Sequence, residues 1–248
     1  MNIDNQLEGK NILITGASNG IGKSLAINLS KFGANVIMLS KDEVVLDSIY
    51  DEIKEEFKTD PMILKCDLAD LDENKSQEIS NIIAENYSRL DAIIHNAAIL
   101  EKMSNIENYD LLTWEKVLKV NLTSAFILSK YLIPLMKSSL TPRIIFTTSN
   151  VGRNGKAFWG AYSVSKAGIN ALSEILSDEL ETISNIKVFN FNPKATQTSM
   201  RALAYPAEDP NSQKKPDSLI KYYLWMLSEN SNSSEEIYIE FGQNLKIK

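Results

Sequence analysis

Residues 11–33 read NILITGASNGIGKSLAINLSKFG: an apolar run, a glycine-rich turn, and a segment with apolar residues at helical spacing. We interpret Asn11–Thr15 as a buried strand and Ile21–Phe32 as a helix that ends at Gly33. Three of the ten glycines in the chain fall within residues 15–22. Glycines between a strand and a helix let the backbone approach a pyrophosphate at the helix N-terminus. The stretch therefore predicts a nucleotide site, with a plain glycine-rich turn as the alternative.

The same strand–helix alternation continues along most of the chain. Further strands are predicted at 35–39, 61–65, 90–95, 143–148, 186–190 and 236–241, with helices at 42–57, 76–87, 111–137, 161–183 and 217–227. Short strands with little internal polarity are typical of a parallel sheet that is buried on both faces. We therefore predict a single α/β domain over residues 1–248, with a doubly wound parallel sheet of about seven strands and helices on both faces.

One region interrupts the alternation. Residues 194–216 contain three of the seven prolines and show no hydrophobic period. Long loops in compact domains are often lids or binding loops. We therefore expect a substrate-loop insertion there, near the carboxyl ends of the strands, where ligands bind to such sheets.

Composition excludes several classes of function. The net charge is −6, from 26 basic and 32 acidic residues, which argues against nucleic acid as a partner. Cys66 and His95 are the only cysteine and histidine, so an intramolecular disulfide and a Cys/His zinc site are excluded. His95 lies in an apolar run, which favours packing over a role in a Ser-His-acid triad. With no signal-peptide pattern and no long apolar run, we expect a cytoplasmic protein without a membrane span or a metal.

Two further motifs carry chemistry. Tyr162 and Lys166 are four residues apart at the start of a predicted helix, so the phenol and the ammonium share a face. A nearby cation lowers the pKa of a tyrosine from about 10 toward neutrality. Ser149 ends a predicted strand and has a hydroxyl that can hold a carbonyl oxygen. Each motif alone has a structural alternative. Tyr162 and Lys166 could be a chance pair on a helix, and Ser149 could serve a turn or a helix cap.

In order and spacing, these motifs resemble the short-chain dehydrogenase/reductase family over nearly the whole chain. The matching pieces are TGxxxGxG at 15–22, Asn96-Ala-Ala98, Asn121, Ser149, YxxxK at 162–166, and Asn192-Pro193 with Thr198. Residues 198–210 and 223–228 look similar to one bacterial branch, the YciK-like reductases. The resemblance implies a Rossmann-like fold, a nicotinamide cofactor and reversible carbonyl/alcohol chemistry.

The resemblance also implies a role for each matching residue. Tyr162 is expected to be the general acid/base, Ser149 to orient the carbonyl, and Lys166 to bind the nicotinamide ribose and lower the Tyr162 pKa. Asn121 is expected to anchor a water that links Lys166 to solvent. The expected cofactor contacts are Gly16, Ser18, Asn19, Gly20, Ile21, Gly22, Ser40, Lys41, Asp67, Leu68, Asn96, Ala97, Ala98, Tyr162, Lys166, Pro193, Thr196 and Thr198.

The end of the second strand indicates which cofactor is used. An acidic residue there selects NAD, whereas a basic residue suits the 2′-phosphate of NADP. Residues 39–41 contain no acid, and Lys41 is well placed, so NADP(H) is favoured over NAD(H). Two residues depart from the family pattern, since Ala98 and Lys194 stand where glycines are usual. If position 194 requires a positive φ, lysine costs about 1 kcal/mol there.

The leading hypothesis is an NADPH-dependent reductase of a small-molecule carbonyl compound. The substrate is either a 3-oxoacyl thioester on an acyl carrier protein or a small aldehyde, ketone or quinone. Basic loop residues would serve the acidic carrier or merely be solvated: Arg153, Lys156, Arg201, Lys214 and Lys215. A nucleotide-binding regulator without turnover is the alternative. By resemblance we expect a homodimer or homotetramer that pairs through helices 111–137 and 161–183. Leu172, Ile175 and Leu176 form an apolar face on the second helix that belongs either to the core or to the interface.

Overall fold

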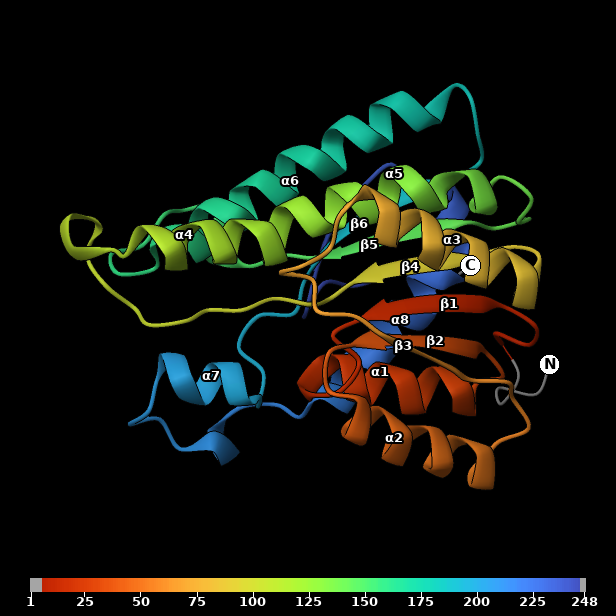
Figure 1. Ribbon diagram of the computed structural model, residues 1–248, viewed down its shortest axis with the longest axis horizontal. Helices are drawn as coiled ribbons and strands as arrows, with labels where there is room; N and C mark the ends of the chain where they lie inside the picture. The colour runs from red at the N-terminus through yellow and green to blue at the C-terminus, as the bar shows by residue number, and fades with distance from the viewer. Residues whose placement is uncertain (1–5, 246–248) are drawn as a thin grey trace.

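The computed structural model describes residues 6–245, whose centre is one parallel sheet between two layers of helices (Figure 1). Its strands are β1 (Asn11–Thr15), β2 (Asn35–Ser40), β3 (Met62–Lys65), β4 (Ala92–His95), β5 (Arg143–Thr147), β6 (Lys187–Asn192) and β7 (Tyr238–Glu240). The order is β3-β2-β1-β4-β5-β6-β7, and every neighbouring pair is parallel. The order reverses between β1 and β4, which is where such sheets bind ligands. The predicted fold class is therefore confirmed.

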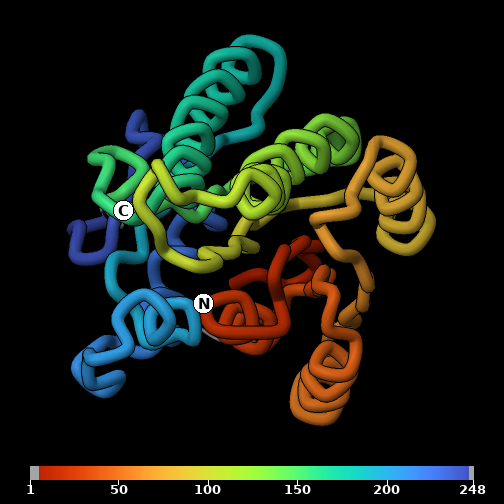
Figure 2. Tube along the Cα trace, turned by 60° about the vertical axis from the view of Figure 1, so that its left-hand side comes forward, coloured from red at the N-terminus to blue at the C-terminus, as the bar shows by residue number. Residues whose placement is uncertain are grey.

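Helices cover both faces of the sheet. They are α1 (Gly20–Lys31), α2 (Glu43–Glu56), α3 (Glu73–Tyr87), α4 (Leu111–Leu118), α5 (Ser124–Met136), α6 (Gly160–Glu181), α7 (Ser199–Ala204) and α8 (Ile220–Leu227). One hydrophobic core joins α1, α2 and α8 to the sheet, and a second joins α3, α5 and α6 to the opposite face (Figures 1 and 2). The strands are buried because both faces are covered, which explains their continuous apolar sequences.

The structure corrects the predicted elements in three places. The predicted helix 111–137 is interrupted by a π-helical segment, Lys119–Thr123, between α4 and α5. The predicted structureless insertion contains α7, which begins where Thr198 Oγ1 accepts a hydrogen bond from the Arg201 N–H at 3.2 Å. A six-residue helix is too short to show a hydrophobic period. The last predicted helix starts at Ile220 because a proline-initiated 3₁₀ turn, Pro216–Leu219, precedes it.

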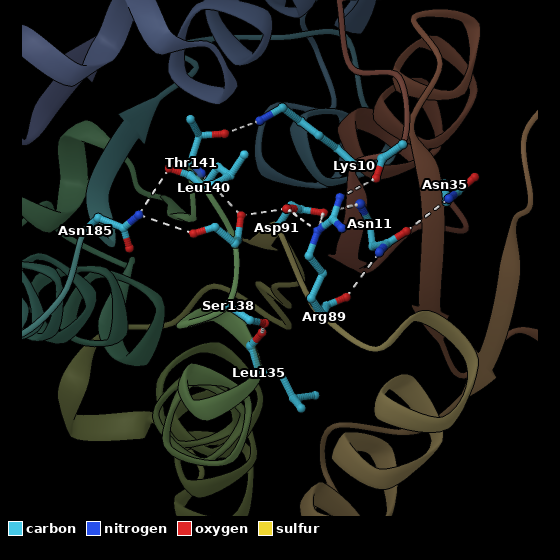
Figure 3. Close-up of polar contacts among 12 residues, drawn as sticks. Lys10, Asn11, Asn35, Arg89, Asp91, Leu135, Ser138, Leu140, Thr141 and Asn185 are labelled. Carbon is cyan, nitrogen blue, oxygen red and sulfur yellow. Dashed lines mark hydrogen bonds and ion pairs between the residues drawn. The ribbon is translucent and has the colours of Figure 1, made fainter.

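A buried polar cluster closes the amino ends of the strands, and Asp91 is its centre (Figure 3). Asp91 is 5% exposed and accepts hydrogen bonds from the Asn11 N–H at 2.9 Å and the Ser139 hydroxyl at 2.6 Å. Its carboxylate also pairs with Arg89 at 3.1 Å. The cluster therefore ties β1 and β4 to the loop that leads into β5.

Residues 6–245 contain no helix that is long and apolar enough to cross a membrane. The predicted domain bounds reach residues 1 and 248, which lie outside the described residues.

Candidate active site

A cavity of about 630 Å³ opens at the carboxyl ends of the strands. In Figure 1 the strand arrowheads point toward this side of the molecule, where α4 and α7 lie. The cavity wall contains nearly all of the predicted site residues, drawn from the segments that follow β1 to β6. Gly22 and Asn121 are the two predicted residues that are absent from the wall. Both nevertheless shape the site by packing.

The turn after β1 is a cradle in which side chains have no room. Gly16 and Gly20 adopt positive φ values of 69° and 53°. A Cβ on Gly16 would lie 2.9 Å from the Ala97 Cα, and one on Gly22 would lie 2.1 Å from the Gly16 carbonyl oxygen. Gly22 thus lets α1 pack against its own turn. A backbone surface at a helix N-terminus fits the diphosphate of a dinucleotide.

Asn19 caps α1 and links the glycine-rich turn to α7. Its Oδ1 accepts a hydrogen bond from the Gly20 N–H at 2.6 Å, which caps α1. Its Nδ2 donates to the Ser199 hydroxyl at 3.2 Å, at the start of α7. The predicted insertion is therefore anchored beside the glycine-rich turn.

The other end of the cavity wall carries small polar groups and one cation. The Ser18 and Ser40 hydroxyls are 2.8 Å apart. Lys41 Nζ lies 3.8 Å from the Asp67 carboxylate, and both side chains are well exposed. Asp67 also accepts a hydrogen bond from the Ala69 N–H at 3.0 Å, so it caps the following turn as well as lining the cavity.

Ser149, Tyr162 and Lys166 come together on the wall, from the end of β5 and the start of α6. Tyr162 is 7% exposed and Lys166 is 2% exposed. Lys166 Nζ donates to the Thr147 carbonyl at 2.7 Å and lies 5.7 Å from the centre of the Tyr162 ring. A hydroxyl, a phenol and an ammonium therefore share one buried corner of the cavity.

Burial shifts two pKa values in this corner. Burial lowers the pKa of Lys166 to about 8. Burial also raises the pKa of Tyr162 to about 12, and the hydrogen bond with Ser149 opposes this only in part. The Lys166 Nζ–H group donates a hydrogen bond to the Thr147 carbonyl, and the expected lowering of the Tyr162 pKa by Lys166 stays a prediction.

Asn121 lies in the π-helical segment, behind the cavity wall. Its amide exchanges two hydrogen bonds with Ile99, accepting from the N–H at 2.8 Å and donating to the carbonyl at 2.9 Å. It also donates to the Ser165 hydroxyl, next to Lys166, at 3.1 Å. Asn121 thus joins the loop after β4 to α6. Such π segments often occur at functional sites.

His95 is packed, as its sequence neighbourhood predicted. Its ring stacks on Phe146 at 4.8 Å between centroids and shares a 3.0 Å hydrogen bond with the Ser129 hydroxyl. Burial lowers the pKa of His95 to about 3, so the ring is neutral. No three His, Cys, Asp or Glu side chains within residues 6–245 are grouped as metal ligands.

Lys194 adopts the left-handed conformation, with φ 53°, that the family's glycine at this position suggested. Its N–H donates to the Asn192 side chain at 3.0 Å, and its Nζ pairs with Glu240 at 2.7 Å. The departure from glycine therefore strains the backbone without displacing the chain from the cavity wall.

The apolar part of the cavity was not predicted from the sequence. Trp159 and Tyr205 line it with Met200, and no sequence spacing brings these residues together. Met200 and Tyr205 lie in the predicted substrate loop, but the aromatic character of Trp159 and Tyr205 is shared with many core residues and does not place them on the cavity wall.

Comparison with known proteins agrees with this geometry. The family model for short chain dehydrogenases matches residues 10–209, and the chain belongs to that family of oxidoreductases. It is 36% identical over 225 residues to the uncharacterised oxidoreductase YciK of Escherichia coli K12, covering 91% of this chain and 88% of YciK.

A solved short chain dehydrogenase from Escherichia coli CFT073, complexed with NADPH, superimposes with a TM-score of 0.93. That comparison covers 97% of this chain and 99% of the other, at 34% identity. The chain is also 37% identical over 176 residues to the 3-oxoacyl-acyl-carrier-protein reductase FabG of Rickettsia prowazekii, covering 71% and 68% of the two chains. The resemblance to this family and to its YciK-like branch is therefore confirmed.

Proposed function

We propose that this chain is an NADP(H)-dependent reductase that converts a carbonyl group into an alcohol, reversibly. The observation that carries the proposal is the buried corner of Ser149, Tyr162 and Lys166, which faces the same cavity as the glycine-rich turn. A protein that only bound a nucleotide would not need a buried phenol there.

When bound, the nicotinamide supplies or accepts a hydride. The Ser149 hydroxyl holds the substrate carbonyl oxygen beside the Tyr162 phenol, with which it shares a hydrogen bond. The Tyr162 hydroxyl gives its proton to the alkoxide that develops there. Lys166 supplies a positive charge near the phenol, with its Nζ 5.7 Å from the centre of the Tyr162 ring, and Asn121 links α6 to the loop after β4.

The residues at the end of β2 support NADP(H) over NAD(H). Ser18, Ser40 and Lys41 offer two hydroxyls and a cation, which suits a 2′-phosphate, and no carboxylate follows β2 directly. The NADPH complex of the related Escherichia coli enzyme agrees with this choice. We expect Lys41→Ala to weaken NADPH binding about tenfold and NADH binding little, by fluorescence titration. Lys31→Ala, an exposed lysine on α1, is the matched control. Equal loss for both cofactors would contradict the preference.

A small-molecule carbonyl compound is the proposed substrate, and a 3-oxoacyl thioester is one candidate, supported by the similarity to FabG. A carrier protein would need free basic residues. Arg201 is compensated by Glu208 at 2.6 Å, whereas Arg153 lies over the Tyr238 ring, a neutral partner, at 4.4 Å. The thioester without its carrier is the simpler probe, because it tests the carbonyl chemistry without depending on carrier docking.

We also propose a cytoplasmic homodimer or homotetramer that pairs through α5 and α6. Phe126 on α5 and Ile175 on α6 are each about half exposed. Leu172 and Leu176 instead pack against the core, so the apolar face of α6 is narrower than the sequence indicated.

Oxidation of NADPH in the presence of a carbonyl panel, including acetoacetyl-coenzyme A, tests the proposed function. Turnover of any member that is lost in Tyr162→Phe supports it. If NADPH binds and no carbonyl is reduced, the alternative of a regulatory nucleotide-binding protein is favoured.

A further inference from the structure

The cationic side chains that line the cavity differ in whether a carboxylate balances their charge. Six of them line it: Lys41, Lys116, Lys156, Lys166, Lys194 and Arg201. Four of the six pair with carboxylates, namely Lys41 with Asp67, Lys116 with Glu101, Lys194 with Glu240 and Arg201 with Glu208. Within residues 6–245, Lys156 and Lys166 have no carboxylate within 4 Å. The proposed function already assigns Lys166 to the reacting centre, so Lys156 remains.

Lys156 lies on the loop before α6 and reaches Tyr205, the residue that follows α7 within the insertion. Its Nζ donates to the Tyr205 hydroxyl at 3.1 Å and lies 5.5 Å from the centre of the Tyr205 ring. A phenol is a neutral partner, so it does not compensate the charge of the ammonium. An exposed, uncompensated cation on the wall of a binding cavity is suited to hold an anionic group of a ligand.

The surface between Lys156 and the reacting corner is aromatic and apolar. The Trp159 ring lies 5.6 Å from the Tyr162 ring and 6.1 Å from the Tyr205 ring, so it bridges the two. Val151, Met200 and Ala204 belong to the same hydrophobic cluster around Tyr162, and all three line the cavity. This cluster is separate from the two cores on the faces of the sheet.

Tyr205 is held in place from its other side. The Arg201 guanidinium lies 3.7 Å from the centre of its ring, and both Arg201 nitrogens that face Glu208 donate to that carboxylate, at 2.6 and 2.7 Å. Because Arg201 is neutralised by Glu208, it orients Tyr205 without offering a second anion site. Lys156 is thus the cation that faces the cavity beyond Trp159.

We propose that the substrate carries an anionic group, a carboxylate or a phosphate, that Lys156 binds, joined to the reacting carbonyl through an apolar, flat body that lies along Trp159. The inference rests on the proposed function, because it takes Tyr162 and Ser149 as the reacting end.

Three probes with the same aryl ketone body test the inference. They are 4-acetylbenzoate, its neutral isostere 4-acetylbenzamide, and 4-acetylphenyl phosphate. Binding to the NADP⁺-loaded protein is measured by calorimetry, and reduction by NADPH oxidation. Wild type is compared with Lys156→Met, with Lys156→Arg, and with Lys102→Met, an exposed lysine outside the cavity wall that controls for net charge.

We expect the wild type to bind an anionic probe more tightly than the amide, by about fivefold, which is the range of a partly exposed ion pair. Lys156→Met is expected to remove this preference while amide binding is unchanged. Lys156→Arg and Lys102→Met are expected to retain it. Whether the benzoate or the phosphate benefits more identifies the group.

An equal affinity for the amide and for both anionic probes, or a preference for an anionic probe that survives in Lys156→Met, would overturn the inference. The proposed function fails differently, through the absence of NADPH oxidation with every probe. Because the affinities do not depend on turnover, the binding comparison decides the role of Lys156 in either case.

Discussion

The two ends of the central sheet are built on opposite principles. At the amino ends, Asp91 is almost fully buried, and its carboxylate is matched by Asn11, Arg89 and Ser139 (Figure 3). At the carboxyl ends, a cavity of about 630 Å³ is lined by the glycine-rich backbone and by the Tyr162 phenol and the Lys166 ammonium. Burial shifts the pKa values of both side chains. The same strands therefore carry a closed polar network that stabilises the fold at one end and the chemistry at the other. Substitutions at the two ends should have separable effects.

The largest effect is expected from Tyr162→Phe. This change removes the proton donor and keeps the ring that packs between Trp159 and the core. The value of kcat/KM should fall about a thousandfold, with a melting temperature within roughly 2 °C of wild type. Steady-state NADPH oxidation and a thermal melt measure the two quantities. A large loss of stability with modest loss of rate would mean that the phenol is structural.

The reverse pattern is expected from Asp91→Ala. Loss of the carboxylate leaves the buried Asn11 N–H and the Ser139 hydroxyl without their acceptor, which costs about 2–4 kcal/mol. The half-exposed Arg89 adds little. Chemical denaturation measures the loss, and Lys130→Met, which breaks an exposed pair with Glu73, should cost under about 1 kcal/mol. Asp91→Ala should leave the dissociation constant of NADPH unchanged. A tenfold higher dissociation constant would show that the amino and carboxyl ends of the sheet are coupled.

A change of pH tests the carboxyl end alone. The Tyr162 pKa of about 12 keeps the phenol protonated through the working range, whereas the Lys166 pKa of about 8 makes its ammonium lose charge as the pH rises through 8. We therefore expect kcat/KM for reduction to be flat below about pH 7 and to fall above about pH 8. In Lys166→Arg the guanidinium stays charged, so the surviving activity should lack this decline. A decline that begins only near pH 10 would contradict the role given to Lys166.

The smallest expected effect concerns backbone strain beside the cavity. Lys194 has a φ of 53°, which glycine adopts without penalty. Lys194→Gly should raise the stability by about 1 kcal/mol, since its exposed ion pair with Glu240 contributes little. Lys194→Ala keeps the strain and loses the pair, so it should not be stabilised. Equal melting temperatures for the two variants would show that the strain is relieved elsewhere.

The sequence predicted the sheet well because each buried strand is a short apolar run and each helix has its own period. Asn11–Thr15 was predicted with the bounds of β1 itself. The π-helical segment was missed because Asn121 has no local signal: its hydrogen bonds go to Ile99 and Ser165, which are distant in sequence. Helix α7 was missed because a six-residue helix capped by Thr198 has no measurable period.

The site was predictable where backbone conformation or local spacing defines it. The glycines of residues 15–22 and the pair Tyr162 and Lys166 are of this kind, and the cavity wall contains all of them except Gly22. The rise in the Tyr162 pKa was not predictable, because it comes from burial, which the sequence does not show. The Trp159 and Tyr205 wall depends on how the insertion folds back over the cavity, which is a tertiary property.

The central claim is that the carboxyl end of the sheet reduces a carbonyl with NADPH. The most direct test follows the hydrogen that NADPH transfers, by means of a deuterium label. Wild-type protein is incubated with NADPH deuterated at the transferred nicotinamide position and an excess of 4-acetylbenzamide or acetoacetyl-coenzyme A. We predict that mass spectrometry detects an alcohol product one mass unit heavier than the same alcohol formed with unlabelled NADPH. The wild type should form this product and Tyr162→Phe should not. If NADPH binds and the label stays on the nicotinamide with every carbonyl offered, the chain is not a reductase and the account is contradicted.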